Sequence, residues 1–229
     1  MKHSGKARKA AFKLILLSLV AGMVLWGLGA LISVIGTVLA AIAVPVLIVV
    51  WLLFTVFTVY FFRDPNPRVP AGAGLVVAPA HGKVDVIDTT TEPQFMGGEC
   101  RRVSIFLSVF NVHVQNAPVG GKVSFLKYTI GQFLNAMRTE SALYNENVLL
   151  GFDAADPAGQ KIGVRLIAGV IARRIVPFVQ TGDEVARGER ISLIQFGSRA
   201  DVYLPPNAQI KVQLGDRVVG GETVLAVLT

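Results

Sequence analysis

The chain has 229 residues, of which 52% are hydrophobic and 16% are charged, and its 22 Lys and Arg against 15 Asp and Glu give a net charge of +7. A chain this apolar and this weakly charged is not intrinsically disordered, and its length suits one or two domains. The single cysteine, Cys100, excludes an intrachain disulfide and a multi-cysteine metal site and suits a reducing compartment.

The positive charge is concentrated at the N-terminus. Residues 1–62 hold five Lys or Arg residues and no Asp or Glu. Residues 63–229 hold the other 17 basic residues and all 15 acidic ones, a net charge of only +2. Binding of nucleic acid requires a basic patch on the folded part of a protein, so this distribution argues against a nucleic-acid partner.

A charge-free segment of 49 residues, Leu14–Phe62, follows the basic N-terminus. One membrane-spanning helix needs about 20 apolar residues, so the segment is long enough for two helices and a tight turn. We predict the spans Ala11–Leu31 and Ile35–Phe57 and assign residues 1–62 to a membrane anchor. The apolar run is too long for a signal peptide, and a single long tilted helix is the weaker alternative.

Basic residues flank both ends of this anchor. They are Lys2, Lys6, Arg8, Lys9 and Lys13 before it and Arg63 and Arg68 after it. The connecting turn has no charge, so the positive-inside rule places both ends in the cytoplasm. We therefore expect a protein of the cell membrane whose remaining domain lies on the cytoplasmic side.

A Pro- and Gly-rich linker, residues 63–76, separates the anchor from a β-rich domain, residues 77–229. Short Val- and Ile-rich runs alternate there with Gly and Pro turns, which predicts closely spaced strands. The predicted strands are Leu75–Val77, Val84–Ile87, Val103–Val114, Lys122–Tyr128, Ile162–Ala168, Ile191–Phe196 and Val202–Leu204. The stretch Gly131–Ala142 is expected to form a loop or a short helix.

Two sequence patterns occur twice in this domain. Ala78–Val84 and Ala117–Val123 share A-P-x-x-G-K-V, and Gly182–Glu189 and Gly215–Glu222 share G-D-x-V-x-x-G-E. Glycine supplies the positive φ of such turns, and Asp bonds to the turn backbone. The patterns resemble the half-motifs of lipoyl- and biotinyl-type domains. We therefore predict a mainly β fold with a duplicated barrel-sandwich-like domain.

One candidate for chemistry is Gly197-Ser198, which lies between two apolar runs. By itself the pair predicts a turn. It does not match the nucleophile elbow G-x-S-x-G, because position 200 is Ala. A serine hydrolase is therefore disfavoured.

The second candidate is His113, near the end of the predicted strand Val103–Val114. Strand alternation turns it away from the more apolar face, where it is either a solvent-side histidine or a functional one. The three histidines, His3, His81 and His113, lack the close spacing of metal ligands, which argues against a zinc site.

Six segments, taken in order, form a specific pattern. They are Ile105–Val114, Gly131–Ala136, Asn145–Asn147, Ile167–Ile175, Gly188–Ile191 and Phe196–Ser198. This pattern resembles the phosphatidylserine decarboxylases of the short bacterial and archaeal type, from about Arg63 to the C-terminus. A membrane anchor before the domain suits an enzyme that acts on a lipid headgroup.

The resemblance implies a self-made cofactor. In the family, the serine of a Gly-Ser pair attacks the preceding carbonyl, β-elimination cleaves the ester, and the serine is left as an N-terminal pyruvoyl group. Carried over, cleavage of Gly197–Ser198 gives a β chain of residues 1–197 and an α chain of residues 198–229. The pyruvoyl group forms a Schiff base with phosphatidylserine, takes up the electrons as CO₂ leaves, and releases phosphatidylethanolamine.

The resemblance also implies a base for self-cleavage. His113 matches the family's histidine and is the candidate, because histidine titrates near neutral pH. Arg173 and Arg174 either hold the lipid phosphate or form a solvated surface. The implied partners are phosphatidylserine, the membrane, and the chain's own α and β products as a heterodimer, alone or in a higher oligomer. Either a diacyl or an ether lipid would suit the chemistry.

One position departs from the family pattern. The family commonly has Asp in a P-A-D-G motif that orients the histidine, whereas His81 occupies that place here. A neutral imidazole accepts a hydrogen bond but offers no fixed negative charge. Either His81 is a weaker partner, or Asp85 or Glu146 replaces it, or maturation is impaired. The presence of both the Gly-Ser pair and His113 favours retained activity.

Two alternative functions follow from the same sequence. One is a non-catalytic, membrane-tethered adaptor or carrier, in which Lys83 or Lys122 would have to bear a lipoyl or biotinyl group. Neither lysine has the neighbouring Met that is typical of carrier domains. The other alternative is a pseudoenzyme that keeps the fold but does not mature because of His81.

Overall fold

The computed structural model describes residues 5–31, 36–132, 145–169, 174–195 and 198–228. The chain divides into two compact units, Gly5–Asp64 and the remainder from Pro65 onward. The first unit contains the helices α1 (Lys6–Leu31) and α2 (Gly36–Phe61).

The two helices pair with each other inside the first unit. The indole Nε1 of Trp51 in α2 donates a hydrogen bond of 2.7 Å to Oγ of Ser18 in α1, and Pro45 lies within α2. Both helices are long and apolar enough to cross a membrane. The predicted pair of apolar helices is confirmed. α1 begins five residues before the predicted span, at its basic end, and α2 ends four residues after it, at its aromatic end.

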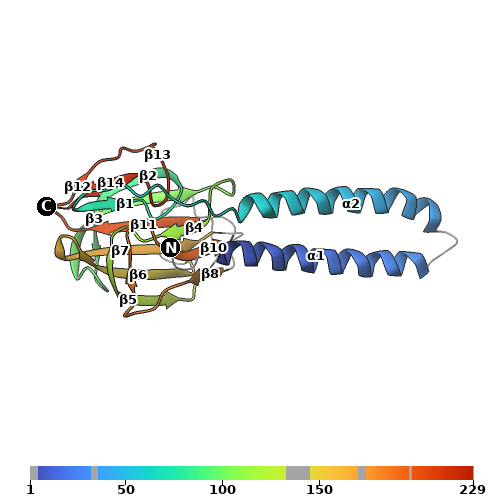
Figure 1. The fold of residues 1–229 in the computed structure, drawn as a ribbon, viewed down its shortest axis with the longest axis horizontal. Coiled ribbons are helices and arrows are strands. Elements are labelled where there is room, and N and C mark those ends of the chain that lie inside the picture. Colours follow the sequence, from blue (N-terminus) through green and yellow to red (C-terminus); the bar gives the residue numbers. More distant parts are fainter. Residues whose placement is uncertain (1–4, 32–35, 133–144, 170–173, 196–197, 229) are drawn as a thin grey trace. The chain divides into compact units, whose positions relative to one another are not determined.

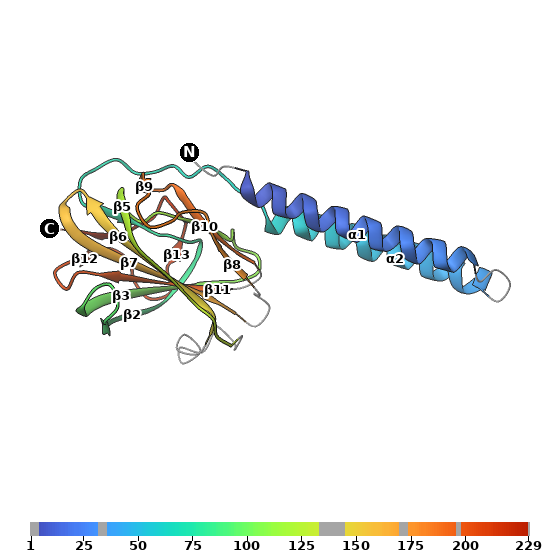
Figure 2. The ribbon, with the colours of Figure 1, turned by 90° about the horizontal axis from the view of Figure 1, so that it is seen from below.

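The second unit consists of strands in three sheets (Figure 1). Its strands are β1 (Leu75–Val77), β2 (Gly82–Glu92), β3 (Gly98–Leu107), β4 (Val114–Asn116), β5 (Gly121–Thr129), β6 (Asn147–Ala155), β7 (Ala158–Ala168), β8 (Arg174–Pro177), β9 (Glu184–Val185), β10 (Arg190–Gln195), β11 (Ser198–Leu204), β12 (Gln209–Ile210), β13 (Arg217–Val218) and β14 (Val224–Val227). A large sheet in the order β13-β2-β3-β11-β7-β6-β5-β9 curls over two small sheets, β1-β14-β12 and β4-β10-β8 (Figure 2).

The predicted duplication is confirmed by matching hydrogen bonds in the two repeats. In each repeat the last Val of A-P-x-x-G-K-V exchanges backbone hydrogen bonds with the G-D turn, and the second Gly of G-D-x-V-x-x-G-E donates to the Ala that opens the other motif. In chain order the pairs are Val84 with Asp216 and Gly215, Val123 with Asp183 and Gly182, Gly221 with Ala78, and Gly188 with Ala117. Each repeat therefore builds the same turn-and-strand unit from local turn chemistry.

One repeat is inserted into the other. The strand order of the large sheet is symmetric about its centre. Counted inward from the two edges, β13 corresponds to β9, β2 to β5, β3 to β6 and β11 to β7. The strands β4 to β10 then form one complete repeat, and β1 to β3 form the other together with β11 to β14. The short β6–β7 hairpin has its counterpart in the pair β3 and β11, whose connection contains the whole inserted repeat.

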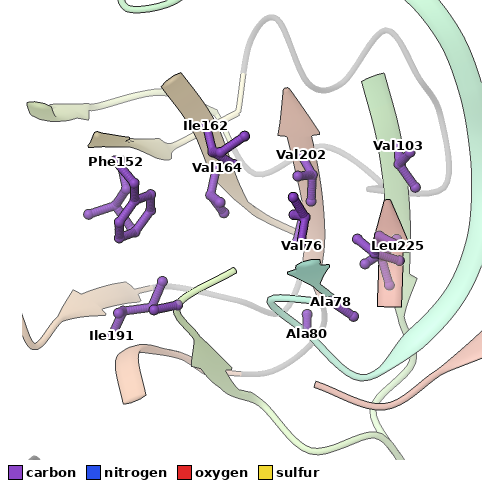
Figure 3. Close-up of a cluster of buried hydrophobic side chains, with 14 of the residues drawn as sticks. Val76, Ala78, Ala80, Val103, Phe152, Ile162, Val164, Ile191, Val202 and Leu225 are labelled. Atoms are coloured by element: carbon purple, nitrogen blue, oxygen red, sulfur yellow. The ribbon is translucent and has the colours of Figure 1, made fainter. Parts of the chain in front are cut away.

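The core lies between the curled sheet and the small sheets. Figure 3 shows Val76, Ala78 and Ala80 from one layer facing Val202, Val164 and Phe152 from the other, all fully buried. The strand alternation of β7 and β11 gives these inward positions, because every second side chain points to the same face.

A second, smaller cluster covers the outer face of the sheet. It contains Phe95, Cys100, Leu149 and Tyr203. Phe95 comes from the turn between β2 and β3, where the buried Glu92 carboxylate accepts backbone N–H bonds at 94, 95 and 96. The turn thereby folds back over the outer face of the sheet, where Nη2 of Arg165 in β7 lies 3.4 Å from Oε1 of Glu92.

The segment before β1 lies along the second unit. Arg187 donates to the carbonyls of Pro70, Gly72 and Leu75, and the buried Arg190 donates to Oδ1 of Asn66. Arginine suits this role because its guanidinium presents several donors in a fixed plane.

The prediction of one continuous strand over Val103–Val114 is wrong. β3 ends at Leu107 and β4 begins at Val114, and the residues between them form a turn and a loop. Phe110 is 64% exposed and His113 is fully buried, the reverse of the expected faces. Alternation over this run of apolar residues was misleading because the chain leaves one repeat for the other there. Most of Gly131–Ala142 lies outside the described residues.

The start of β5 should be intolerant of a side chain. Gly121 has φ +151°, and a Cβ there would lie 2.1 Å from the carbonyl oxygen of Asp153. We expect Gly121→Ala to lower the free energy of unfolding by about 2 kcal/mol or more. Chemical unfolding of the full chain in detergent measures this. Gly98→Ala is the control, because nothing lies within 4 Å of its Cβ. Equal stability of the two variants would contradict the prediction.

Candidate active site

Ser198 is the first residue of β11 and is completely buried. Its backbone pairs on one side with Leu107 at the end of β3 and on the other with Ala168 at the end of β7. Its hydroxyl has no hydrogen-bond partner among the residues that the structure describes. A buried hydroxyl without a partner is costly, because no hydrogen bond compensates for its lost contact with water. Gly197 lies outside the described residues.

His113 lies directly before β4 and is also completely buried. Its Nδ1 is 2.9 Å from the carbonyl oxygen of Asn111. A carbonyl can only accept, so Nδ1 is the protonated nitrogen of the neutral ring and Nε2 is the basic one. The carbonyl of His113 in turn accepts from the backbone N–H of Ile194 in β10 at 3.1 Å.

A short turn holds the Asn111 carbonyl in place. The side-chain Oδ1 of Asn111 accepts from the backbone N–H of Ser108 at 2.9 Å and from its hydroxyl at 2.8 Å. The backbone N–H of Asn111 donates to the carbonyl of Ser108 at 2.9 Å. Three hydrogen bonds thus close the turn that precedes the histidine.

The two crossings between the repeats bring these residues to one end of the sheets. His113 lies on the crossing from β3 to β4, and Ser198 ends the crossing from β10 to β11. The antiparallel pairing of β10 with β4 places the start of β4 beside the end of β10, which leads directly to Ser198. Residues 85 apart in sequence therefore belong to the same region.

His81 lies in the connection from β1 to β2 and is partly exposed. A methyl group on Gly220 would be 3.0 Å from Cδ2 of His81 and 3.0 Å from Oδ1 of Asn116, so the ring lies close to both residues. Because Lys83 pairs with Phe106, the register also places His81 beside the end of β3. It therefore belongs to the same end of the sheet as Ser198.

The two carboxylates considered as replacements for the family Asp are already engaged. Asp85 forms an ion pair of 2.5 Å with Arg199, and burial raises its pKa although the guanidinium opposes the shift. Glu146 accepts a hydrogen bond from the Tyr128 hydroxyl, and burial together with this bond raises the pKa of Tyr128 to about 12. For His113, the backbone carbonyl of Asn111 is the hydrogen-bond partner that positions Nδ1.

Among the remaining predicted residues, Arg174 is exposed and pairs with Gln195, three residues before Ser198. Arg173 lies outside the described residues. Within the described part of the chain, no group of three His, Cys, Asp or Glu side chains is arranged to hold a metal ion.

Sequence reasoning missed Asn111 and Arg199. The Ser and Asn three residues apart in Ser108-Val-Phe-Asn111 are a turn signal that was available, but the predicted strand concealed it. No sequence signal links Arg199 to Asp85, because the pair depends on strands β2 and β11 lying on either side of β3.

Comparison with known proteins shows the family of this chain. The family model for phosphatidylserine decarboxylase matches residues 54–226. A protein of Desulfotalea psychrophila named phosphatidylserine decarboxylase proenzyme is 45% identical over 186 residues, covering 81% of this chain and 86% of its own. Proteins of the same name from Symbiobacterium thermophilum and Gluconobacter oxydans are 43% and 49% identical, covering 82% and 76% of this chain and 89% and 78% of their own. The chain belongs to the phosphatidylserine decarboxylase family of enzymes.

Proposed function

We propose that this enzyme decarboxylates phosphatidylserine to phosphatidylethanolamine and CO₂ with a pyruvoyl group that it makes from its own Ser198. The observation that carries the proposal is the Ser198 hydroxyl, which is buried at the first position of a central strand and has no hydrogen-bond partner in the described part of the chain. Such a hydroxyl is not used for folding, and it fits a group that is consumed in making the cofactor.

Self-cleavage requires the Ser198 hydroxyl to lose its proton. Oγ attacks the carbonyl carbon of Gly197, the Gly197–Ser198 C–N bond breaks, and an ester with a free amine results. Removal of the Ser198 α-proton then expels the Gly197 carboxylate from Cβ. Tautomerisation and addition of water release ammonia and leave the pyruvoyl group. His113 is the proposed base, with Nε2 taking the hydroxyl proton and returning it to the departing amine nitrogen.

The Asn111 carbonyl supports this role for His113. It fixes Nδ1 as the protonated nitrogen and leaves Nε2 to act as base, which is the orienting part of a triad carboxylate's role. It supplies a dipole instead of a full negative charge, so the imidazolium is stabilised less. His81 would therefore not prevent maturation, and the pseudoenzyme alternative is not favoured.

The sheet pairing supports a stable complex of the two cleavage products. Residues 198–229 provide β11 between β3 and β7, β14 between β1 and β12, and β13 beside β2. All of the flanking strands except β12 belong to residues 1–197. The α and β chains would thus stay together as a heterodimer without a covalent link.

The pyruvoyl carbonyl supplies the electron sink for decarboxylation. The chain's own contribution is to place the lipid. Arg174, exposed near the end of β10, is positioned to meet an anionic lipid phosphate. The two apolar helices would hold the enzyme at the cell membrane, and the flanking basic residues favour the cytoplasmic side for the catalytic unit. The adaptor alternative is not favoured, since Lys83 and Lys122 lie within strands β2 and β5 instead of at a hairpin tip.

Ser198→Ala should leave a single chain of 229 residues and abolish decarboxylation, because the variant lacks the attacking oxygen. Intact-mass analysis of protein purified from membranes checks this, with conversion of phosphatidylserine assayed in parallel. The unmodified protein should give chains of 197 and 32 residues, the shorter with a blocked N-terminus. An uncleaved natural protein that forms no phosphatidylethanolamine would refute the proposed function.

His113→Gln should slow self-cleavage about 100-fold or more, because it removes the base. The rate of appearance of the 198–229 chain after cell-free synthesis with detergent measures this. A rate within a few-fold of the unmodified protein would assign the base to another residue.

His81→Asp should change the rate of self-cleavage by less than about tenfold, because Asn111 already orients His113. A tenfold or larger change is typical of a residue that orients a reacting group. The same time course measures it. A large gain in rate would show that His81 limits maturation.

A further inference from the structure

The residue after the cleavage site, Arg199, is buried on the opposite face of β11 from Ser198. Only 3% of its side chain is exposed. Alternation along a strand separates the two side chains, so Ser198 points to the core side and Arg199 to the outer side. On the outer side its guanidinium interacts with two carboxylates.

These carboxylates come from two different strands. Nη2 of Arg199 is 2.5 Å from Oδ2 of Asp85 in β2, and Nε is 3.3 Å from Oδ1 of Asp201 in β11 itself. Asp201 is 99% buried and Asp85 has a side chain exposed by 30%. The pairing of Asp85 thus reaches across β3, which lies between β2 and β11.

A local irregularity in β2 makes this reach possible. The β2–β3 register shifts between Val84 and Val86, so Asp85 lies at a bulge. A bulge re-aims a side chain out of the regular alternation. The chain therefore departs from ideal pairing at the residue that contacts Arg199.

Cleavage would remove the covalent restraint on the N-terminal side of Ser198. Before cleavage, the chain continues into the crossing from β10, and afterwards residue 198 is a chain end. The end residues of a strand open most easily. Displacement of a reacting group by about 1 Å can lower a reaction rate about 100-fold. An interaction that fixes the residue next to Ser198 would therefore help to keep the rate of reaction at Ser198 high.

We propose that Arg199 is a positioning residue, which holds the Ser198 end of β11 in register through its ion pair with Asp85. The inference rests on the proposed self-cleavage at Gly197–Ser198. Asp201 lies beside the guanidinium on the same strand, and Asp85 links it to the β chain. The same link would keep the new N-terminus of the α chain in place after cleavage.

Asp85→Asn, Arg199→Gln and the double variant test the proposal. Each single change should slow self-cleavage about tenfold, and the double variant should be no slower than the slower single variant, because both changes remove one interaction. Arg199→Lys, which keeps the charge without the planar fork, should fall between Arg199→Gln and the natural protein. The measurement is the time course of the 198–229 chain after cell-free synthesis, by mass spectrometry.

A matched control exists on the same face of the sheet. Asp88 of β2 pairs with Arg102 of β3 at 2.5 Å, and its side chain is exposed by 39%. Both residues belong to residues 1–197, so this ion pair does not join β11 to β2. Asp88→Asn should lower the thermal midpoint about as much as Asp85→Asn and leave the cleavage rate within twofold.

The outcomes separate the two proposals. If the natural protein is cleaved but Asp85→Asn is cleaved at the natural rate, the role of Arg199 is wrong and the proposed function stands. Equal slowing by Asp88→Asn, or multiplying effects in the double variant, would also overturn it, since the effect would then be general destabilisation. Absence of cleavage in the natural protein would instead overturn the proposed function.

Discussion

The pairing of β11 on both sides is the constraint on which the rest of the structure depends. This strand lies in the middle of the curled sheet, with β3 on one side and β7 on the other. In the second repeat the corresponding connection is the short turn between β6 and β7. In the repeat formed by β1 to β3 and β11 to β14, the connection between β3 and β11 contains the entire inserted repeat, β4 to β10. A bond at the start of β11 can therefore break without loss of any strand pairing, because both ladders persist.

The same arrangement explains why the site lies where it does. The crossing from β3 to β4 carries His113, and Ser198 begins β11 directly after the crossing from β10. Chemistry-bearing residues are commonly found on such connections, positioned by a rigid scaffold.

Polar side chains lie on both faces of β11, but their surroundings differ. On the inner side, Ser198 adjoins an apolar core, and none of the described residues forms a hydrogen bond with its hydroxyl. On the outer side, Arg199 and Asp201 are buried and form an ion pair, and the charges of Arg102 and Arg165 also act on Asp201. Burial of charge is tolerated there because each is met by an opposite charge. Near the Ser198 end of the sheet, the backbone carbonyl of Asn111 accepts the hydrogen bond of His113 Nδ1.

The sequence alone determined the two apolar helices, the β-rich second unit, the duplication and the family. Each of these features has a local sequence signal. An uncharged run of membrane-spanning length indicates the helices, turn residues at fixed offsets indicate the strands and the duplication, and motifs in a fixed order indicate the family. Only the tertiary structure decided that one repeat is inserted into the other, that Val103–Val114 is interrupted, and that His113 is buried and oriented by Asn111. It also decided that Arg199 contacts Asp85. These features depend on which strands become neighbours, and residues far apart in sequence carry no local signal of the contact that brings them together.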